Sequence, residues 1–552
     1  MKQNNKILQG NFRYILLICF VFLLSCKEEK KSSDTGGGFF SNLFSSESLT
    51  ELDPSEVTQA LDELKATGVL SMEDEVHSFY ARRDGKPFWN TDALRKAYLN
   101  QLNQTEKDGL RPEDYHLQAL KELQETAPES PQDHAHLEIL LSDSFLNLAH
   151  DLFYGKLDPR ELHEIWDVER ESLQLDSIAN NIENDNQLTA LLEDLRPNHP
   201  VYQGLVQSLS EIRESLKEEQ PVFDQIPTGE AIEPGDTDSR IPAIGARLQQ
   251  LDFLDTSVDL GSTTYTPELE EAITAFQQSK HMAADGIIGK TTLRELNMTL
   301  EDRYKQVLVN LERWRWYPRD LGQHYILINI PQYKLVVVKD GDTIRSHNVV
   351  AGTKQRQTPI FSDQLDHIVL NPTWTLPPTI KSEDVLPKAA NDPSYFANNN
   401  MIVSSAQGET VDPSTVDWSS SAARNYTITQ RPGATNPLGR VKIMYPNQYS
   451  IYLHDTPAQG LFERSERAAS SGCVRVEGAL ELAQYVVQNQ PSGSKEEIDS
   501  VLQTGKTTNV SISEPIKVYH FYWTAWREAG ETQFTEDVYS MDQKIAQALL
   551  SN

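Results

Sequence analysis

The sequence predicts a multidomain α+β protein, helical in its N-terminal half and mostly antiparallel β in its C-terminal half. A chain of 552 residues exceeds the size at which a single hydrophobic core stops growing, so about three or four domains are expected. From residue 55 to residue 226, apolar residues recur three and four positions apart, which is the helical period. After Gly322 they alternate with a period of two, which is typical of strands.

Composition limits the classes of function. Apolar residues make up 38% of the chain and charged residues 24%, as in soluble globular proteins. A formal net charge of −31 repels nucleic-acid phosphates, so DNA and RNA are disfavoured as partners. The sequence has three cysteines, Cys19, Cys26 and Cys473, which are too few and too isolated for a disulfide framework or a cysteine-based zinc site.

Residues 1–26 are predicted to be a lipoprotein signal peptide. Basic residues precede the apolar run Tyr14–Leu24, which is too short to span a bilayer as a mature helix. The Leu-Leu-Ser-Cys sequence that ends at Cys26 resembles the bacterial lipobox, and this implies that Cys26 is lipidated and anchors the chain to a membrane. The alternative is an ordinary cleaved signal with an incidental cysteine. Residues 27–54, rich in Lys, Ser and Gly, are expected to be a flexible tether.

Residues 55–230 are predicted to form a helical domain. The runs Leu117–Thr126 and His136–Tyr154 carry the helical spacing most clearly, and Asp108-Gly109 marks a break between helices.

A smaller helical unit is predicted over residues 238–300. One helix is expected at Thr266–Gln278, with proline in its first turn, and Asp285-Gly286 supplies a tight turn before the next. Residues 301–320 follow as one more helix.

Residues 323–529 are predicted to form the mostly antiparallel β domain. Asp340-Gly341 between the β-branched runs Lys334–Lys339 and Asp342–Asn348 is a strong hairpin signal. Further strands are expected near residues 366–370 and 441–444.

Two other segments complete the chain. Residues 381–431 have no clear periodicity, and a loop of this length is usually functional or disordered. Residues 530–552 are expected to form a C-terminal helix.

The residues that carry chemistry lie between 450 and 476. Tyr452 and His454 alternate onto one face of a predicted strand. Cys473 follows shortly downstream, and a thiol becomes a nucleophile when a nearby histidine lowers its pKa and shuttles its proton. Gly472 lets the backbone approach a substrate closely and turn its N–H groups towards a developing oxyanion.

The pair of motifs His454-Asp455-Thr456 and Ser470–Arg475 resembles the catalytic domain of L,D-transpeptidases. Thr358–Phe361 and Asn371-Pro372 match that family as well, and the resemblance covers about residues 323–529. It implies that Cys473 is the nucleophile and His454 the general base. It also implies oxyanion or substrate contacts from neighbouring residues: Gly472, Ser471, Arg475, Tyr452 and Trp374.

Some of these roles stay open. Tyr452 is either an active-site hydroxyl or plain sheet packing, and Arg475 either contacts a substrate carboxylate or forms a structural ion pair. Many family members have histidine where Ser471 stands and glycine where Asp455 stands, although both choices resemble the large branch of the family. The sequence therefore indicates no certain group that orients His454.

The remaining domains resemble parts of the large Gram-negative enzymes. Phe79–Trp89, Asp108–Leu110 and Phe153–Leu157 resemble their scaffold domain. Phe276–Leu293 resembles the small three-helix peptidoglycan-binding domain, although such a unit also serves as a spacer. Residues 381–431 resemble the capping subdomain over the substrate groove, and a lineage-specific surface insertion is the alternative.

These resemblances imply a peptidoglycan L,D-transpeptidase of the cell envelope, lipid-anchored in the outer membrane and facing the periplasm or the cell surface. Its substrates would be peptidoglycan stem peptides, carbapenems would be covalent inhibitors, and neither a metal nor an organic cofactor would be required. The alternatives are a sortase-like transpeptidase and a non-catalytic peptidoglycan-binding lipoprotein. The diamino acid of the substrate and the range of acceptors stay open.

Overall fold

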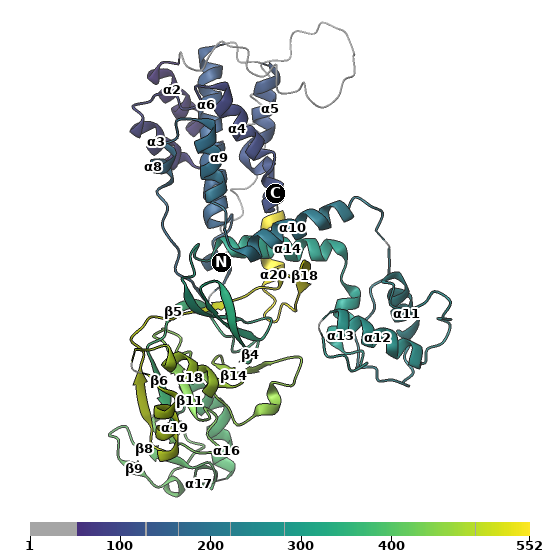
Figure 1. The fold of residues 1–552 in the computed structure, drawn as a ribbon, viewed down its shortest axis with the longest axis vertical. Coiled ribbons are helices and arrows are strands. Elements are labelled where there is room, and N and C mark those ends of the chain that lie inside the picture. The colour runs from purple at the N-terminus through teal and green to yellow at the C-terminus, as the bar shows by residue number, and fades with distance from the viewer. Residues whose placement is uncertain are drawn as a thin grey trace. The chain divides into compact units, whose positions relative to one another are not determined.

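The computed structural model describes residues 52–551, apart from residues 127–129 and the single positions 164, 221, 281, 393 and 492. The chain divides into two compact units. The first contains the described residues up to Asp158, Arg170–Arg213 and Leu311–Arg319. The second contains Pro159–Glu169, Glu214–Asn310 and the chain from Asp320 onward. Figure 1 shows the elements of each unit.

The predicted signal peptide, residues 1–26 with the lipidation site Cys26, and nearly all of the tether predicted over 27–54 lie outside the described residues. No helix among the described residues is both long and apolar enough to cross a membrane.

The first unit is helical. Helices α2 (Pro54–Thr67) and α6 (Pro131–Tyr154) have proline in their first turn, where the missing amide costs nothing. Asp53 and Ser130 precede these helices and complete capping boxes. The other helices wholly within residues 52–215 are α3 (Glu73–Arg82), α4 (Asp92–Leu102), α5 (Leu117–Thr126), α8 (Leu175–Ala179), α9 (Asp185–Asp194) and α10 (Pro200–Ser215), together with α7 (Pro159–Leu162), which belongs to the second unit.

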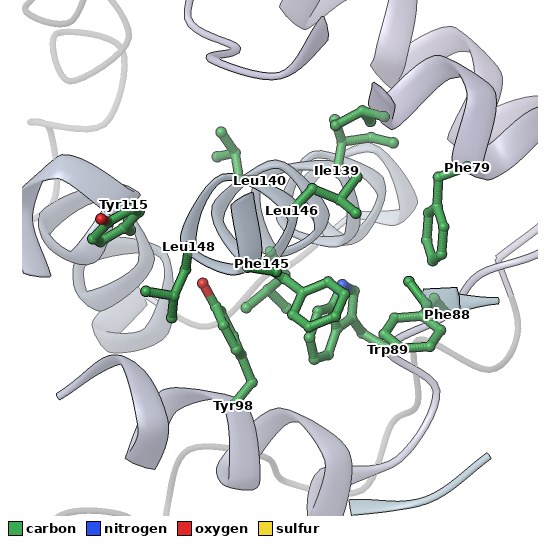
Figure 2. Packing of buried hydrophobic residues seen from close by; sticks show 14 of the residues in the cluster. Phe79, Phe88, Trp89, Tyr98, Tyr115, Ile139, Leu140, Phe145, Leu146 and Leu148 are labelled. Atoms are coloured by element: carbon green, nitrogen blue, oxygen red, sulfur yellow. The ribbon is translucent and has the colours of Figure 1, made fainter. Parts of the chain in front are cut away.

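Helix α6 is the centre of the first unit. Buried residues lie on every side of its middle turns, which is typical of a helix inside a core. The ring of Phe145 lies 5.8 Å from Trp89, 5.9 Å from Tyr98 and 6.1 Å from Phe88 between ring centroids. Figure 2 shows these four rings together on one side of the helix. Aromatic packing of this kind stabilises a core beyond the area that it buries.

A buried polar cluster joins distant segments of the first unit. The Asp108 carboxylate accepts hydrogen bonds from Arg196 Nε at 2.9 Å and from Tyr202 Oη at 3.0 Å. Arg315 donates to the Asp108 carbonyl and to Tyr202 Oη. Because Arg315 lies more than 200 residues after Asp108, this cluster closes the unit with a segment that returns to it late in the chain.

That returning segment is the end of α14 (Leu300–Arg315), close to the helix predicted over 301–320. The chain leaves the first unit after Arg213 and rejoins it at Leu311. The small helical domain between these points is therefore an insertion in the sequence of the first unit.

The small domain has three helices, as predicted: α11 (Ile241–Gln250), α12 (Pro267–Ser279) and α13 (Lys290–Asn297). They enclose a core of their own. The buried side chain of Gln277 accepts a hydrogen bond from the amide of Gly286 at 3.0 Å and donates to the carbonyl of Ile287 at 2.9 Å. Gly286 has a φ of +71°, which explains the glycine in this turn.

The β domain of the second unit is built on a 12-stranded sheet. Its strands are β1 (Trp166–Asp167), β2 (His324–Asn329), β3 (Lys334–Lys339), β4 (Asp342–Gly352), β5 (Ile360–Gln364), β6 (His367–Leu370), β11 (Val441–Met444), β12 (Leu453–His454), β13 (Ala468–Ser470), β14 (Val474–Val476), β15 (Thr508–Ser511) and β16 (Lys517–Phe521). Their order is β1-β5-β16-β2-β3-β4-β14-β12-β11-β6-β15, with β13 beside β4.

Most strand pairs of this sheet are antiparallel, as predicted, and the pairs β1–β5, β2–β16, β4–β13 and β12–β14 are parallel. The predicted hairpin joins β3 to β4. Asp340 and Gly341 have φ values of 53° and 90°, as a two-residue turn with two left-handed positions requires. Helices α18 (Ala479–Gln488) and α19 (Lys495–Thr504) follow β14 in the chain.

Residues 374–430, called the cap below, have a compact fold. They contain β7 (Trp374–Thr375), α15 (Pro378–Ile380), a π-helical turn (Lys381–Val385), α16 (Leu386–Asn391), α17 (Tyr395–Asn398), β8 (Met401–Ser404), β9 (Thr410–Val411) and β10 (Thr427–Gln430). The strands form a separate sheet in the order β7-β10-β8-β9. A core of their own includes Phe396 and Trp418. The cap therefore begins before the predicted boundary at residue 381 and is more than a loop.

The structure corrects two other expectations. Residues 55–230 do not form one helical domain: the last helix ends at Ser215, and β1 pairs with β5 of the sheet. The predicted C-terminal helix over 530–552 is wrong in its first part. Residues 525–534 form a hairpin of β17 (Ala525–Glu528) and β18 (Glu531–Phe534), and α20 (Asp542–Leu550) begins later. Ala529 and Gly530 have left-handed φ values and form the two-residue turn of this hairpin. The glycine at position 530 was the sequence signal for this turn, and the prediction of a continuous helix overlooked it.

Replacement of Phe145 by alanine should destabilise the first unit locally. Loss of a fully buried aromatic ring costs about 3–5 kcal/mol. Amide exchange in peptides from α6 should therefore accelerate about 100-fold or more when measured by hydrogen–deuterium exchange, because these amides open with the unit. Peptides from β2 and β3 are the internal control and should keep their protection. Unchanged exchange in α6 would show that Phe145 does not support this core.

Candidate active site

Three neighbouring strands bring the predicted catalytic residues together. Strand β12 pairs in parallel with β14, so that His454 lies opposite Arg475, and antiparallel with β11, so that His454 also lies opposite Lys442. Tyr452 and Cys473 are two residues before His454 and Arg475, and the hydrogen bond from the Val474 amide to the Tyr452 carbonyl sets them side by side. Because residues two apart share a face of a sheet, all these side chains face the same way.

The Cys473 thiol is only partly exposed. Its Sγ lies 3.8 Å from the carbonyl oxygen of Ser450. Burial raises the pKa of the thiol above its usual value, while hydrogen bonds from the amide and hydroxyl of Tyr452 and the positive charges of Lys442 and Arg475 act to lower this pKa. The net direction is upward, so the resting sulfur is a protonated thiol.

His454 is held by a backbone carbonyl. Its Nδ1 lies 2.6 Å from the carbonyl oxygen of Asp455. A carbonyl can only accept, so Nδ1 carries the proton, and Nε2 keeps the lone pair that a general base needs. Burial, above all, lowers the pKa of His454 to about 3, so the imidazole is neutral at physiological pH. The group that orients His454 is thus the main-chain carbonyl of Asp455. The sequence could not indicate it, because every residue type has such a carbonyl.

The histidine and the cysteine are not hydrogen-bonded to each other. Among the residues that the structure describes, the sulfur contacts polar groups of Ser450 and Tyr452 instead. The rings of Tyr452 and His454 lie 5.7 Å apart between centroids. Tyr452 therefore lies beside both the thiol and the imidazole, which favours an active-site position for its hydroxyl over plain sheet packing.

The aspartate at position 455 has a local structural role. Its Oδ2 accepts a hydrogen bond from the Arg440 amide at 2.9 Å, just before β11 begins. Gly439 has a φ of +59°, and a Cβ there would lie 2.2 Å from Asp455 Oδ2. Asp455 and Gly439 thus close the turn before β11 together, which gives the aspartate at position 455 a structural role.

Side-chain hydroxyls hold the loop that carries Cys473. Ser470 Oγ donates to the Cys473 carbonyl at 2.6 Å and accepts from the Gly472 amide at 3.1 Å. Thr358 Oγ1 donates to the Gly472 carbonyl at 2.8 Å. Gly472 has a φ of +109°, which disfavours any other residue. Because the Gly472 amide is already bonded, the Cys473 amide, which has no hydrogen-bond partner among the described groups, is the better oxyanion donor.

Arg356 connects this loop to the cap, and the sequence analysis missed it. Its Nη1 lies 3.0 Å from Ser471 Oγ and 2.8 Å from Asp384 Oδ2, and its Nη2 pairs with Glu383. The Ser471 side chain is exposed and lies beside this ion-paired arginine. Trp374, which the resemblance placed among the substrate contacts, lies in β7 and packs against the core of the cap.

Arg475 has no ion pair within the described part of the chain, and its Nε is buried without a hydrogen-bond partner. Burial lowers its pKa. The described residues therefore provide no partner for the structural ion pair that was the alternative role of Arg475. No group of three or more His, Cys, Asp and Glu side chains that could hold a metal ion occurs among them either.

Comparisons with known proteins assign each domain. A family model described as "Scaffold domain" matches residues 74–209, one described as "Putative peptidoglycan binding domain" matches 237–296, and one described as "L,D-transpeptidase catalytic domain" matches 323–510. A protein of Haemophilus influenzae named "Putative L,D-transpeptidase" is 38% identical over 255 residues, which are 46% of this chain and 50% of the relative. The match thus spans half of the relative's length.

Solved structures similar to this chain include L,D-transpeptidases of Xylanimonas cellulosilytica and Stackebrandtia nassauensis. The first is 14% identical, covers 53% of this chain and 99% of its own, and has a TM-score of 0.17. The second is 13% identical, covers 55% and 99%, and has a TM-score of 0.18. The family-model matches show that residues 323–510 form an L,D-transpeptidase catalytic domain, which the chain carries together with a scaffold domain and a peptidoglycan-binding domain.

Proposed function

We propose that this protein is a peptidoglycan L,D-transpeptidase in which Cys473 is the nucleophile and His454 the general base. The observation that carries the proposal is the juxtaposition of the two residues on paired strands, with Nδ1 of the histidine engaged by the Asp455 carbonyl. A neutral imidazole that carries its proton on Nδ1 and a lone pair on Nε2 is the form that can take a thiol proton. A non-catalytic wall-binding protein would not need this arrangement.

In the first proposed step, His454 Nε2 takes the proton of the Cys473 thiol. The thiolate attacks the carbonyl carbon of the third stem-peptide residue, a diamino acid, at its bond to D-Ala. The Cys473 amide donates to the oxyanion that develops. The C–N bond then breaks, the leaving D-Ala amine takes the proton from the His454 imidazolium, and a thioester remains.

In the second step, the side-chain amine of the diamino acid in another stem attacks the thioester carbonyl. His454 takes the amine proton, the C–S bond breaks, and the sulfur leaves as a thiolate and regains a proton from the imidazolium. The product is a 3→3 cross-link. These two acyl transfers balance without a metal or an organic cofactor.

The other domains suggest how the chain is placed on its substrate. The small domain at 238–300, matched by the peptidoglycan-binding family, would hold the wall polymer while the β domain acts on its stem peptides. Its alternative role is that of a spacer. Lipidation at Cys26 would anchor the chain in the cell envelope, towards the periplasm or the cell surface.

Replacement of Cys473 by alanine should abolish cross-linking without unfolding the protein, because no other group can form the thioester. The measurement is mass analysis of the products from purified full-length chain and disaccharide-tetrapeptide. Cys26→Ala, which removes a cysteine outside the catalytic motifs, is the matched control and should still make cross-linked dimer. Dimer formation by Cys473→Ala would overturn the assignment of the nucleophile.

Replacement of His454 by glutamine should slow acylation of Cys473 by a carbapenem at least about 100-fold, as expected for loss of a general base. Intact-mass spectra should show one adduct per wild-type chain, mapped to the peptide that contains Cys473. Because the pKa of His454 is about 3, the base is lost only as the pH falls through that value. The wild-type rate should therefore show no acid limb near pH 6.5. A limb centred there would mean that His454 titrates as an ordinary histidine.

The ion pairs of Arg356 should help the cap to position the substrate. Glu383→Gln combined with Asp384→Asn removes both carboxylates from Arg356, and partly exposed pairs contribute at most about 1 kcal/mol each. The KM for disaccharide-tetrapeptide should rise about threefold, while alkylation of Cys473 by iodoacetamide stays unchanged. Glu409→Gln removes a carboxylate elsewhere in the cap and is the control. An equal loss of both activities would instead indicate damage to the fold.

A further inference from the structure

Lys442 belongs to the row of residues around the thiol but has no part in the steps above. It lies on β11 directly opposite His454. Its Nζ stands 3.8 Å from the centroid of the Tyr452 ring, within the range of a cation–π contact. The side chain is only partly exposed, and no carboxylate within the described residues forms an ion pair with it. Lysine is seldom withdrawn from water without such a partner.

The groups facing Lys442 offer it little negative charge. From β12 and β14 these are the neutral His454, the cation Arg475 and the Tyr452 hydroxyl, together with Cys473. On the other side, β6 places Val369 opposite Lys442.

The next β6 residue on that face, His367, lies opposite Met444, and its Nδ1 is 2.8 Å from Asp366. Among these groups, the one beside Lys442 that gains a negative charge in the proposed reaction is therefore the Cys473 thiol, which is neutral at rest.

The electrostatic coupling runs both ways. Burial lowers the pKa of Lys442, and a negative charge on Cys473 opposes that effect. In return, the Lys442 ammonium favours the ionised sulfur, since an opposite charge nearby stabilises the charged form. His454 is neutral at rest, so no imidazolium stands ready as a counter-ion before the proton moves.

We propose that Lys442 is a positioning residue for the proposed transpeptidase reaction. Its ammonium holds the Tyr452 ring beside the sulfur and stabilises the negative charge that forms on Cys473 when the proton leaves for His454. The role rests on the proposed function, and it is tested through the thiol itself, without any cross-linking assay.

The test is the pH dependence of Cys473 alkylation by iodoacetamide, measured in the full-length chain from pH 7 to 10.5. Trypsin releases Cys473 within residues 468–475, away from the other two cysteines, so mass spectrometry follows this thiol alone. Lys442→Gln should move the midpoint of the profile upward by about one pH unit, the lower end of the effect of a nearby charge. Lys442→Arg should restore most of the shift.

Lys517→Gln is the matched control, because Lys517 is an exposed lysine on β16 of the same sheet. It should leave the midpoint in place. His454→Gln should shift the midpoint less than Lys442→Gln does, since a neutral imidazole contributes no charge. Circular dichroism verifies folding, and if Lys442→Gln does not fold, Lys442→Met keeps the unbranched stem and takes its place.

An unchanged midpoint in the folded Lys442 variant would overturn the proposal, and so would a shift that arginine fails to reverse or that Lys517→Gln reproduces. A different measurement would overturn the proposed function itself. In that case Cys473→Ala would still make cross-linked dimer, whatever the pH dependence of alkylation shows.

Discussion

The parallel pairing of β12 with β14 is the constraint on which the rest of the site depends. It sets His454 opposite Arg475 and brings Cys473 beside Tyr452, although 18 residues separate the histidine from the cysteine. A slip of one residue in either strand would turn its side chains to the other face and separate the pair. The hydroxyls of Ser470 and Thr358 and the left-handed Gly472 hold the cysteine loop in this register.

Burial determines how this site can work. It raises the pKa of the thiol and lowers that of the imidazole, so the resting pair is neutral rather than a thiolate–imidazolium pair. Charge then appears only when the proton moves, and groups that favour this charge matter most during the reaction. Tyr452, Lys442 and Arg475 are the described groups that lower the pKa of the thiol. The proposed reaction therefore depends on prearranged polar groups around the sulfur.

The modular parts of the chain differ in how they are stabilised. The first unit encloses α6 and is completed by Leu311–Arg319, which the Arg315 hydrogen bonds tie to Asp108. The cap has its own core and sheet, yet its visible polar link to the cysteine loop is the partly exposed cluster around Arg356. Such pairs are weak in water, so the cap is attached to the loop less firmly than the strands are attached to one another.

Local sequence was enough to determine the features that arise from neighbouring residues: the Asp340-Gly341 hairpin, the three helices of the small domain, and the linked motifs that contain His454 and Cys473. Tertiary structure decided what depends on register and burial. Lys442 carries no motif, the Asp455 carbonyl is common to every residue type, and Arg356 meets Ser471 only because the loops converge. The pairing of β1 with β5, across nearly 200 residues, likewise has no local signal. Strand partners and the loss of water around a side chain are set by distant segments, so periodicity along the chain cannot predict them.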